Sequence, residues 1–187
     1  MIRMILASSS PRRCELMKQI GYECEILPSS CVEETNPCRV VSELSSRKAA
    51  DVSTKISGDA VIIGADTVVV SNGRILGKPA DEKDAFHMLK SLQGQTHEVC
   101  TGVTILCRKD HIEETVSFSE TTEVTVASMT DEEILAYIDT KDPMDKAGAY
   151  GIQGSFAKFV TAVRGDYYNV VGLPVAHLYR ELKYFLS

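Results

Sequence analysis

The segment of residues 60–70 most constrains the fold, because it is apolar on both sides of a single acidic residue, Asp66. A long apolar run rich in valine and isoleucine predicts a strand that is buried on both faces. The Asn72-Gly73 pair that follows is typical of a tight hairpin turn. A buried carboxylate without a partner costs roughly several kcal/mol, so we expect a lysine, an arginine or a metal ion beside Asp66. The alternative is an aspartate that hydrogen-bonds to a neighbouring turn.

Helical and extended patterns alternate along the rest of the chain. Strands are predicted at 3–7, 23–27, 98–107, 115–126 and 156–163, and helices at 11–20, 40–52, 81–91, 130–140 and 174–186. Helix–strand alternation followed by long strands on both sides of a Lys109-Asp110 turn predicts an α/β protein with an elongated mixed β-sheet and flanking helices. The length of 187 residues allows one large domain or two small lobes.

Charge and cysteine content exclude several functional classes. The net charge of −6 argues against a broad phosphate-binding surface, so we expect no nucleic-acid partner. No apolar run approaches membrane-spanning length, so we expect no membrane partner. The six cysteines form no C-x-x-C pair and nothing marks the chain for export, which indicates reduced thiols in a cytoplasmic protein.

Residues 8–13, with the sequence SSSPRR, follow a predicted strand and open a predicted helix. Backbone N–H groups, the hydroxyl groups of Ser8 and Ser10 and the guanidinium groups of Arg12 and Arg13 converge there, which suits a phosphate group. The alternative is a plain helix cap with two solvated arginines. The segment is not a Walker loop, because the G-x-x-x-x-G-K pattern is missing.

Two lysines and an acidic pair are further candidates for a phosphate site. Lys48 lies on a predicted helix, and Lys78 lies in a Gly-Lys-Pro loop just after the predicted hairpin. Either could neutralise phosphate oxygens, although most lysines are merely solvated. Glu33 and Glu34 could hold Mg²⁺ together with Asp66, since Mg²⁺ prefers oxygen ligands. The alternative is an acidic pair on a surface loop.

Glycines 148, 151 and 154 lie in one short segment, residues 145–154. They resemble a dinucleotide-binding fingerprint only loosely, because a strand-like pattern follows where a helix should begin. We interpret the segment as a backbone loop that approaches a ligand closely, in which the Gln153 amide could read a base edge. The alternative is a structural cluster of turns. The four histidines are scattered and are interpreted as structural or surface residues.

Taken together, these motifs resemble the Maf family over essentially the whole chain. The matching stretches, in the family's order, are residues 6–13 (LASSSPRR), 32–34 (VEE), 47–49 (RKA), 63–67 (IGADT), 76–79 (LGKP), 94–97 (GQTH), 143–154 (PMDKAGAYGIQG) and 171–174 (VGLP). One departure is Phe156 with Lys158, where relatives carry small residues.

The resemblance implies a single domain over residues 1–187 with a fold like that of inosine triphosphate pyrophosphatase, in which two lobes surround a cleft. It implies hydrolysis of a nucleoside triphosphate to the monophosphate and pyrophosphate with a divalent metal cation, Mg²⁺ or Mn²⁺, and it is consistent with a homodimer. Arg12, Thr67 and Gln153 resemble the branch that acts on dTTP and UTP.

The roles that the resemblance implies fall into three groups. Arg13, Lys48 and Lys78 would bind phosphate oxygens together with the loop around Ser8 and Ser10, and Glu34 with Glu33 would hold the metal ion. Asp66 would be either the general base or a metal ligand. The alternative functions are a 7-methyl-GTP- or ITP-type pyrophosphatase, and a nucleotide-binding regulator of cell division with little turnover.

Overall fold

The computed structural model describes residues 2–30, 37–110 and 112–186. Strand β3 (Ala60–Ser71) is the buried strand that the sequence predicts. It pairs in parallel with β1 (Arg3–Leu6) and antiparallel with β4 (Arg74–Leu76). The turn between β3 and β4 has φ angles of 50° at Asn72 and 73° at Gly73. Two consecutive positive φ angles are the geometry for which Asn-Gly is suited, so the predicted hairpin is confirmed.

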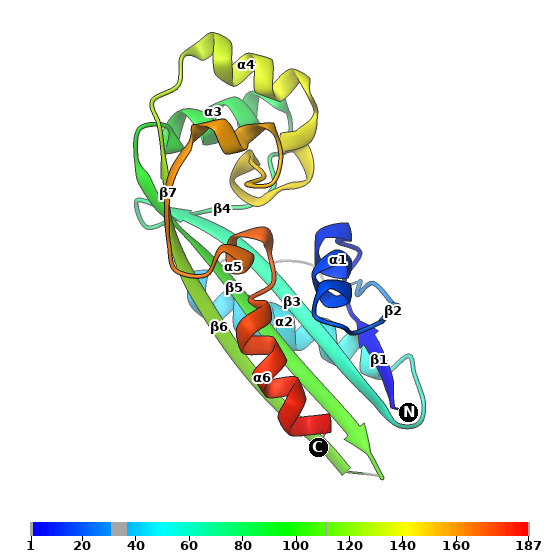
Figure 1. The fold of residues 1–187 in the computed structure, drawn as a ribbon. Helices are drawn as coiled ribbons and strands as arrows, with labels where there is room; N and C mark the ends of the chain where they lie inside the picture. Colours follow the sequence, from blue (N-terminus) through cyan, green and yellow to red (C-terminus); the bar gives the residue numbers. More distant parts are fainter. Residues whose placement is uncertain (1, 31–36, 111, 187) are drawn as a thin grey trace. The chain divides into compact units, whose positions relative to one another are not determined.

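Seven strands of the described chain form one mixed sheet in the order β2-β1-β3-β5-β6-β7, with β4 beside β3 (Figure 1). The remaining strands are β2 (Glu25–Ile26), β5 (Thr96–Lys109), β6 (Ile112–Val126) and β7 (Val160–Arg164). Strands β1 and β2 are parallel, whereas β6 and β7 are antiparallel. The predicted α/β class with a mixed sheet and flanking helices is confirmed.

The described residues form six α-helices, and α3 and α4 begin at residues whose side chains cap them. They are α1 (Pro11–Gln19), α2 (Pro37–Ser53), α3 (Glu82–Leu92), α4 (Asp131–Asp139), α5 (Tyr167–Val171) and α6 (Val175–Leu186). The Asp81 side chain caps α3, and Thr130 with Glu133 forms a capping box on α4. Among the described residues, no helix is both long enough and apolar enough to cross a bilayer.

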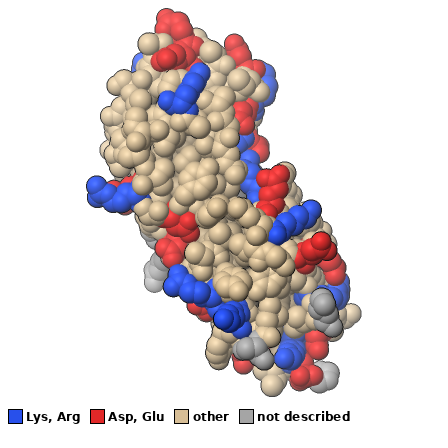
Figure 2. Space-filling view, in the orientation of Figure 1, with Lys and Arg blue, Asp and Glu red and all other residues tan. Residues whose placement is uncertain are grey.

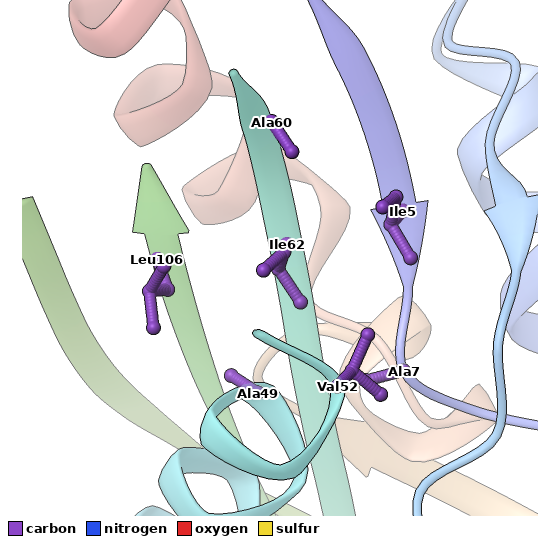
Figure 3. Packing of buried hydrophobic residues seen from close by; sticks show 7 residues of the cluster. All are labelled: Ile5, Ala7, Ala49, Val52, Ala60, Ile62 and Leu106. Carbon is purple, nitrogen blue, oxygen red and sulfur yellow. The ribbon is translucent and has the colours of Figure 1, made fainter. Parts of the chain in front are cut away.

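The chain divides into two compact units. Unit 1 comprises Met1–Asp66, Thr101–Glu120 and Gly172–Ser187, and unit 2 comprises Thr67–Cys100 and Thr121–Val171. In unit 1, buried side chains from β1 and the residue that follows it, α2, β3 and β5 form a core cluster of Ile5, Ala7, Ala49, Val52, Ala60, Ile62 and Leu106 (Figure 3). In unit 2, α3 and α4 lie side by side (Figure 1) and bury Leu89, Leu92, Ile134 and Ile138.

Helix α2 packs against the sheet through backbone contacts in unit 1. A Cβ atom added to Gly64 of β3 would lie 2.1 Å from the carbonyl oxygen of Ser45, and one added to Gly102 of β5 would lie 2.3 Å from that of Val41. The Ser45 hydroxyl group also hydrogen-bonds to Thr104 of β5 at 2.9 Å. Only glycine therefore leaves room for the helix at these two sheet positions.

The predicted strand at 156–163 is wrong in its first half, because Ser155–Phe159 forms the 3-10 helix η3 and β7 begins at Val160. Phe156 and Phe159 are three residues apart, so one 3-10 turn brings both rings to the same side. Both rings are buried, and Phe156 packs 4.7 Å from the Tyr150 ring and 5.6 Å from the Phe159 ring, centroid to centroid. Tertiary packing of the aromatic rings thus overrides the strand-like pattern.

Candidate active site

Asp66 lies in the middle of β3 and forms an ion pair with Lys48 of α2. The exposed fractions of the two side chains are 6% for Asp66 and 14% for Lys48. Alternate residues of a strand share a face, so Gly64 and Asp66 both face α2, and the close approach at Gly64 brings the helix near the carboxylate. The expected partner of the buried carboxylate is therefore a lysine, and the interpretation of Asp66 as a residue that only hydrogen-bonds to a turn is wrong.

The serine loop, residues 8–10 between β1 and α1, lies close to Arg13 in the first turn of α1, in unit 1. Arg13 is buried, and its guanidinium group donates from Nε to the Gly172 carbonyl oxygen at 2.8 Å and from Nη1 to the Ser8 hydroxyl oxygen at 3.1 Å. The Ser10 backbone N–H group donates to the same hydroxyl oxygen at 3.2 Å. Arg12 is half-buried on α1. The alternative of two solvated arginines is wrong for Arg13, whose charge is held beside the serine loop.

In unit 2, the loop that carries Lys78 meets the glycine-rich segment. Lys78 is exposed, and the carbonyl oxygen of its neighbour Gly77 accepts a hydrogen bond from the Gly148 N–H group at 3.0 Å. Gly148 has a φ of 67°, and a Cβ atom there would lie 2.9 Å from the Val69 side chain of β3. The glycine-rich segment therefore presses against β3 at this point, and the contact links two segments that are far apart in the sequence.

The two residues expected to read the base in unit 2 are Gln153 and Thr67. Gln153 is exposed in a turn that the Gly154 N–H group closes by donating to the Gly151 carbonyl oxygen at 3.2 Å. Thr67 is half-buried, and it shares a face of β3 with Val69, against which the glycine-rich segment packs. The 3-10 helix η3 follows the turn in place of an α-helix, which agrees with the exclusion of a dinucleotide fingerprint.

The structure describes one of the candidate metal ligands, Asp66. Glu33 and Glu34 lie outside the described residues. Within residues 2–30, 37–110 and 112–186, no cluster of three or more histidine, cysteine or acidic side chains could hold a metal ion. Of the three carboxylates expected to bind metal, Asp66 is thus the one that the structure describes.

Sequence reasoning missed a second charged cluster, which lies in unit 2 and consists of Tyr137, Asp142 and Lys146. The Lys146 ammonium group donates to the Asp142 carboxylate at 2.9 Å, and the Tyr137 hydroxyl group donates to the other carboxylate oxygen at 2.7 Å. The spacing of four residues between Asp142 and Lys146 is a signal that could have been found in the sequence. Tyr137 lies on a separate helix, α4, and no spacing in the sequence indicates its hydrogen bond to Asp142.

The fold and these residues define a class: an α/β protein with a buried acid–lysine pair on its central strand and an arginine-bearing serine loop at the start of its first helix. The chain belongs to the Maf family, since the family model described as "Maf-like protein" matches residues 3–185.

Relatives of known name are similar to this chain over nearly their full length. A protein of Lachnoclostridium phytofermentans is 48% identical over 99% of this chain and 96% of its own length. One of Carboxydothermus hydrogenoformans is 52% identical over 97% of this chain and 98% of its own length. One of Bacillus cereus strain ZK / E33L is 50% identical over 99% of this chain and 96% of its own length. Each of these relatives is named "dTTP/UTP pyrophosphatase".

Proposed function

We propose that this protein hydrolyses dTTP and UTP at the bond between the α- and β-phosphates, releasing the nucleoside monophosphate and pyrophosphate. The observation that carries the proposal is the Lys48–Asp66 ion pair buried in the middle of β3. It supports a hydrolase because buried ionisable pairs are characteristic of sites where protons are transferred or phosphate charge is bound. Relatives that are 48% to 52% identical carry the name of this activity.

The Asp66 carboxylate is the proposed general base. It would accept a proton from the water molecule whose oxygen attacks the α-phosphorus. As the new phosphorus–oxygen bond forms, the bond from the α-phosphorus to the bridging oxygen breaks, and pyrophosphate leaves with that oxygen. The Lys48 ammonium group would keep the carboxylate oriented, because the ion pair ties a side chain of β3 to α2.

The cationic side chains would stabilise the negative charge that develops on the departing pyrophosphate. Arg13 lies against the Ser8 hydroxyl group, so its guanidinium group and the serine loop with Ser10 could contact the same phosphate. Lys78 is exposed at the surface of unit 2, where its ammonium group is accessible to a ligand.

A divalent cation, Mg²⁺ or Mn²⁺, fits the donor chemistry of these residues, because Asp66 offers a carboxylate oxygen and hard cations prefer oxygen ligands. Glu34, with Glu33, would supply the other protein oxygens. When bound, such an ion would offset the charge of the triphosphate.

The base would be read by Gln153 with Arg12 and Thr67. A glutamine amide can donate to O4 and accept from N3–H, which is the hydrogen-bonding edge that uracil and thymine share. Cytosine presents an amino group and an unprotonated N3 at that edge, so its pattern is inverted. Sites built around such hydrogen bonds reject mismatched ligands, because buried polar groups are left unpaired.

We also propose that the protein acts in the cytoplasm. Cys14, Cys24, Cys100 and Cys107 are free thiols, a state that a reducing compartment maintains.

The test is a panel of nucleotides with Mg²⁺ or Mn²⁺: UTP, dTTP, CTP, ATP, ITP and 7-methyl-GTP. We expect UTP and dTTP to give the highest kcat/KM, with UMP and pyrophosphate as the products from UTP. Asp66→Asn, which keeps the shape and removes the charge, should bind UTP without cleaving it. A higher kcat/KM for ITP or 7-methyl-GTP than for UTP would contradict the assignment of the base and leave that of the reaction unchanged. Binding of UTP without release of pyrophosphate by the wild-type protein would instead favour a regulatory role.

A further inference from the structure

Asp142 is the centre of a partly buried hydrogen-bond network in unit 2. Its carboxylate accepts from the Tyr137 hydroxyl group of α4 at 2.7 Å and from the Lys146 ammonium group at 2.9 Å. Lys146 also donates to the Asp142 backbone carbonyl oxygen at 2.6 Å and to the Asp145 carboxylate at 2.7 Å. An ammonium group has three protons, and these three acceptors use all of them. Lys146 is therefore committed to the protein and is not a further phosphate-binding lysine.

This network contacts both ends of the turn that carries Gln153. At the first end, the Gly151 N–H group donates to the Tyr137 hydroxyl oxygen at 3.2 Å, and a Cβ atom on Gly151 would lie 2.6 Å from Cε of Lys146. At the other end, a Cβ atom on Gly154 would lie 2.9 Å from Oδ2 of Asp142. The backbone is therefore packed against the network on each side of Gln153.

The chemistry of Tyr137 fixes the direction of these hydrogen bonds. A phenol has one proton, and Tyr137 gives it to Asp142 while its oxygen accepts from Gly151. Burial of the ring, and then the hydrogen bond to Asp142, raise the pKa of Tyr137 above its ordinary value, so the group stays protonated at neutral pH. The hydroxyl group thus connects a charged, anchored carboxylate to the backbone of the turn.

We propose that Tyr137, Asp142 and Lys146 are positioning residues that hold the Gln153 turn and thereby set the preference for uracil over cytosine. The inference rests on the proposed function, in which Gln153 reads the base. An amide distinguishes the two bases only when its donor and acceptor are presented in a fixed order and place. A turn that could shift would let the amide satisfy either base.

The first test is Tyr137→Phe, which removes one hydroxyl group from the network and keeps the ring. We expect the ratio of kcat/KM for UTP to kcat/KM for CTP to fall at least fivefold. The loss should come mainly from a higher KM for UTP with kcat changed less than twofold, because contacts to the base act equally on the bound substrate and the transition state.

The matched control is Tyr150→Phe. Tyr150 belongs to the same aromatic cluster, and its hydroxyl group bonds to His97 at 2.7 Å instead of to the turn. It also loses one tyrosine hydroxyl hydrogen bond to a side chain, so it reports the effect of lost stability without a change at the turn. We expect it to keep the wild-type ratio between UTP and CTP.

A second variant, Gly154→Ala, tests the same contact by steric pressure. Gly154 has an extended backbone with φ of −92°, which alanine also adopts, so the new methyl group acts on Asp142 and not on the backbone angle. We expect the same loss of the UTP-to-CTP ratio. If Tyr137→Phe fails to fold, as judged by circular dichroism, the result of Gly154→Ala decides.

The decisive measurement places Tyr137→Phe in a Gln153→Ala background. If the network acts through Gln153, removing the amide should leave Tyr137→Phe with no further effect on the ratio, so the two effects will not add. A wild-type ratio in both Tyr137→Phe and Gly154→Ala, or fully additive effects, would overturn the inference and leave the pyrophosphatase proposal intact. A Gln153→Ala protein that keeps the ratio would overturn the role of Gln153 and this inference together.

Discussion

Lys48 and Asp66 join α2 to β3 through an ion pair that is almost entirely removed from solvent. Breaking a buried pair by removing one partner leaves an uncompensated charge and costs roughly 3–5 kcal/mol. Lys48→Met should therefore lower the free energy of unfolding, measured by urea denaturation, by about that amount. Adding Asp66→Asn should recover part of the loss, since the orphaned charge is then gone. A Lys48→Met protein as stable as the wild type would show that the pair is not maintained in solution.

Lys78 should behave in the opposite way. Its side chain is exposed at the surface of unit 2. Lys78→Ala should leave the free energy of unfolding unchanged and weaken the transition state by roughly 2–4 kcal/mol, because a cation that meets a departing phosphate is lost. The measurements are urea denaturation and kcat/KM for UTP. Lys83→Ala, an exposed lysine on α3, is the control and should alter neither quantity.

Removal of the metal ion should stop the proposed reaction. In excess EDTA, release of pyrophosphate from UTP should fall to the background rate, because the triphosphate would then be repelled by Asp66 and Glu34. Activity should return when Mg²⁺ or Mn²⁺ exceeds the chelator, and Glu34→Gln should raise the metal concentration that gives half-maximal activity. Full activity in EDTA would refute the requirement for a metal.

His97 should make stability depend on pH. Burial lowers the pKa of His97 from 6.5 to about 4 in the folded protein. As pH falls from 6.5 to 4, the unfolded state takes up a proton that the folded state refuses, so stability is lost, by up to roughly 3 kcal/mol, and above pH 6.5 this contribution is constant. Urea denaturation of the wild type and of His97→Gln at pH 7.5, 6 and 5 checks this. The wild type should lose stability relative to the variant, and parallel curves would contradict the assignment.

Gly64→Ala should be strongly destabilising although alanine suits a strand better than glycine does. The added methyl group would lie 2.1 Å from the Ser45 carbonyl oxygen and 2.9 Å from the Ala49 backbone nitrogen, so α2 must move. Overpacked cores typically lose roughly 1–3 kcal/mol, and we expect a loss at the upper end of that range because the contact is with backbone. Gly77→Ala is the control for stability, because a Cβ atom there meets nothing within 4 Å. Thermal or urea unfolding of both variants provides the comparison.

Local patterns in the sequence were sufficient for the features that depend on neighbouring residues. The apolar run around Asp66 and the Asn72-Gly73 turn each depend on residues a few positions apart, and both are confirmed. The 3-10 helix at Ser155–Phe159 was not predicted, since burial of two rings in a tertiary cluster decides its conformation.

The candidate site shows the same division. The apolar run shows that Asp66 is buried and therefore needs a partner. That the partner is Lys48 depends on how α2 packs on the sheet. The network of Tyr137 with Asp142 joins α4 to the 3-10 helix η1 (Asp142–Asp145), and the Gly151 contact to Tyr137 depends on the path of the turn that follows. Such contacts arise from tertiary structure, so they leave little trace in the order of the residues.

Charged side chains of the described residues do not gather by sign on the face of the molecule seen in Figure 2. Figure 2 shows that acidic and basic side chains of the described residues are interspersed on the face that it draws. This arrangement agrees with the net charge of −6 and with the expectation that phosphate is bound locally and not by a broad basic area.

Backbone contact at Gly64 and Gly102 has an evolutionary consequence. At these two points α2 contacts the main chain of the sheet directly, with no side chain of the sheet between them. We therefore expect aliphatic residues of the neighbouring core, such as Ile5 and Val52, to accept replacements of similar volume that leave Lys48 beside Asp66. Gly64 and Gly102 thereby help to keep the geometry of the Lys48–Asp66 pair constant when residues of the surrounding core change.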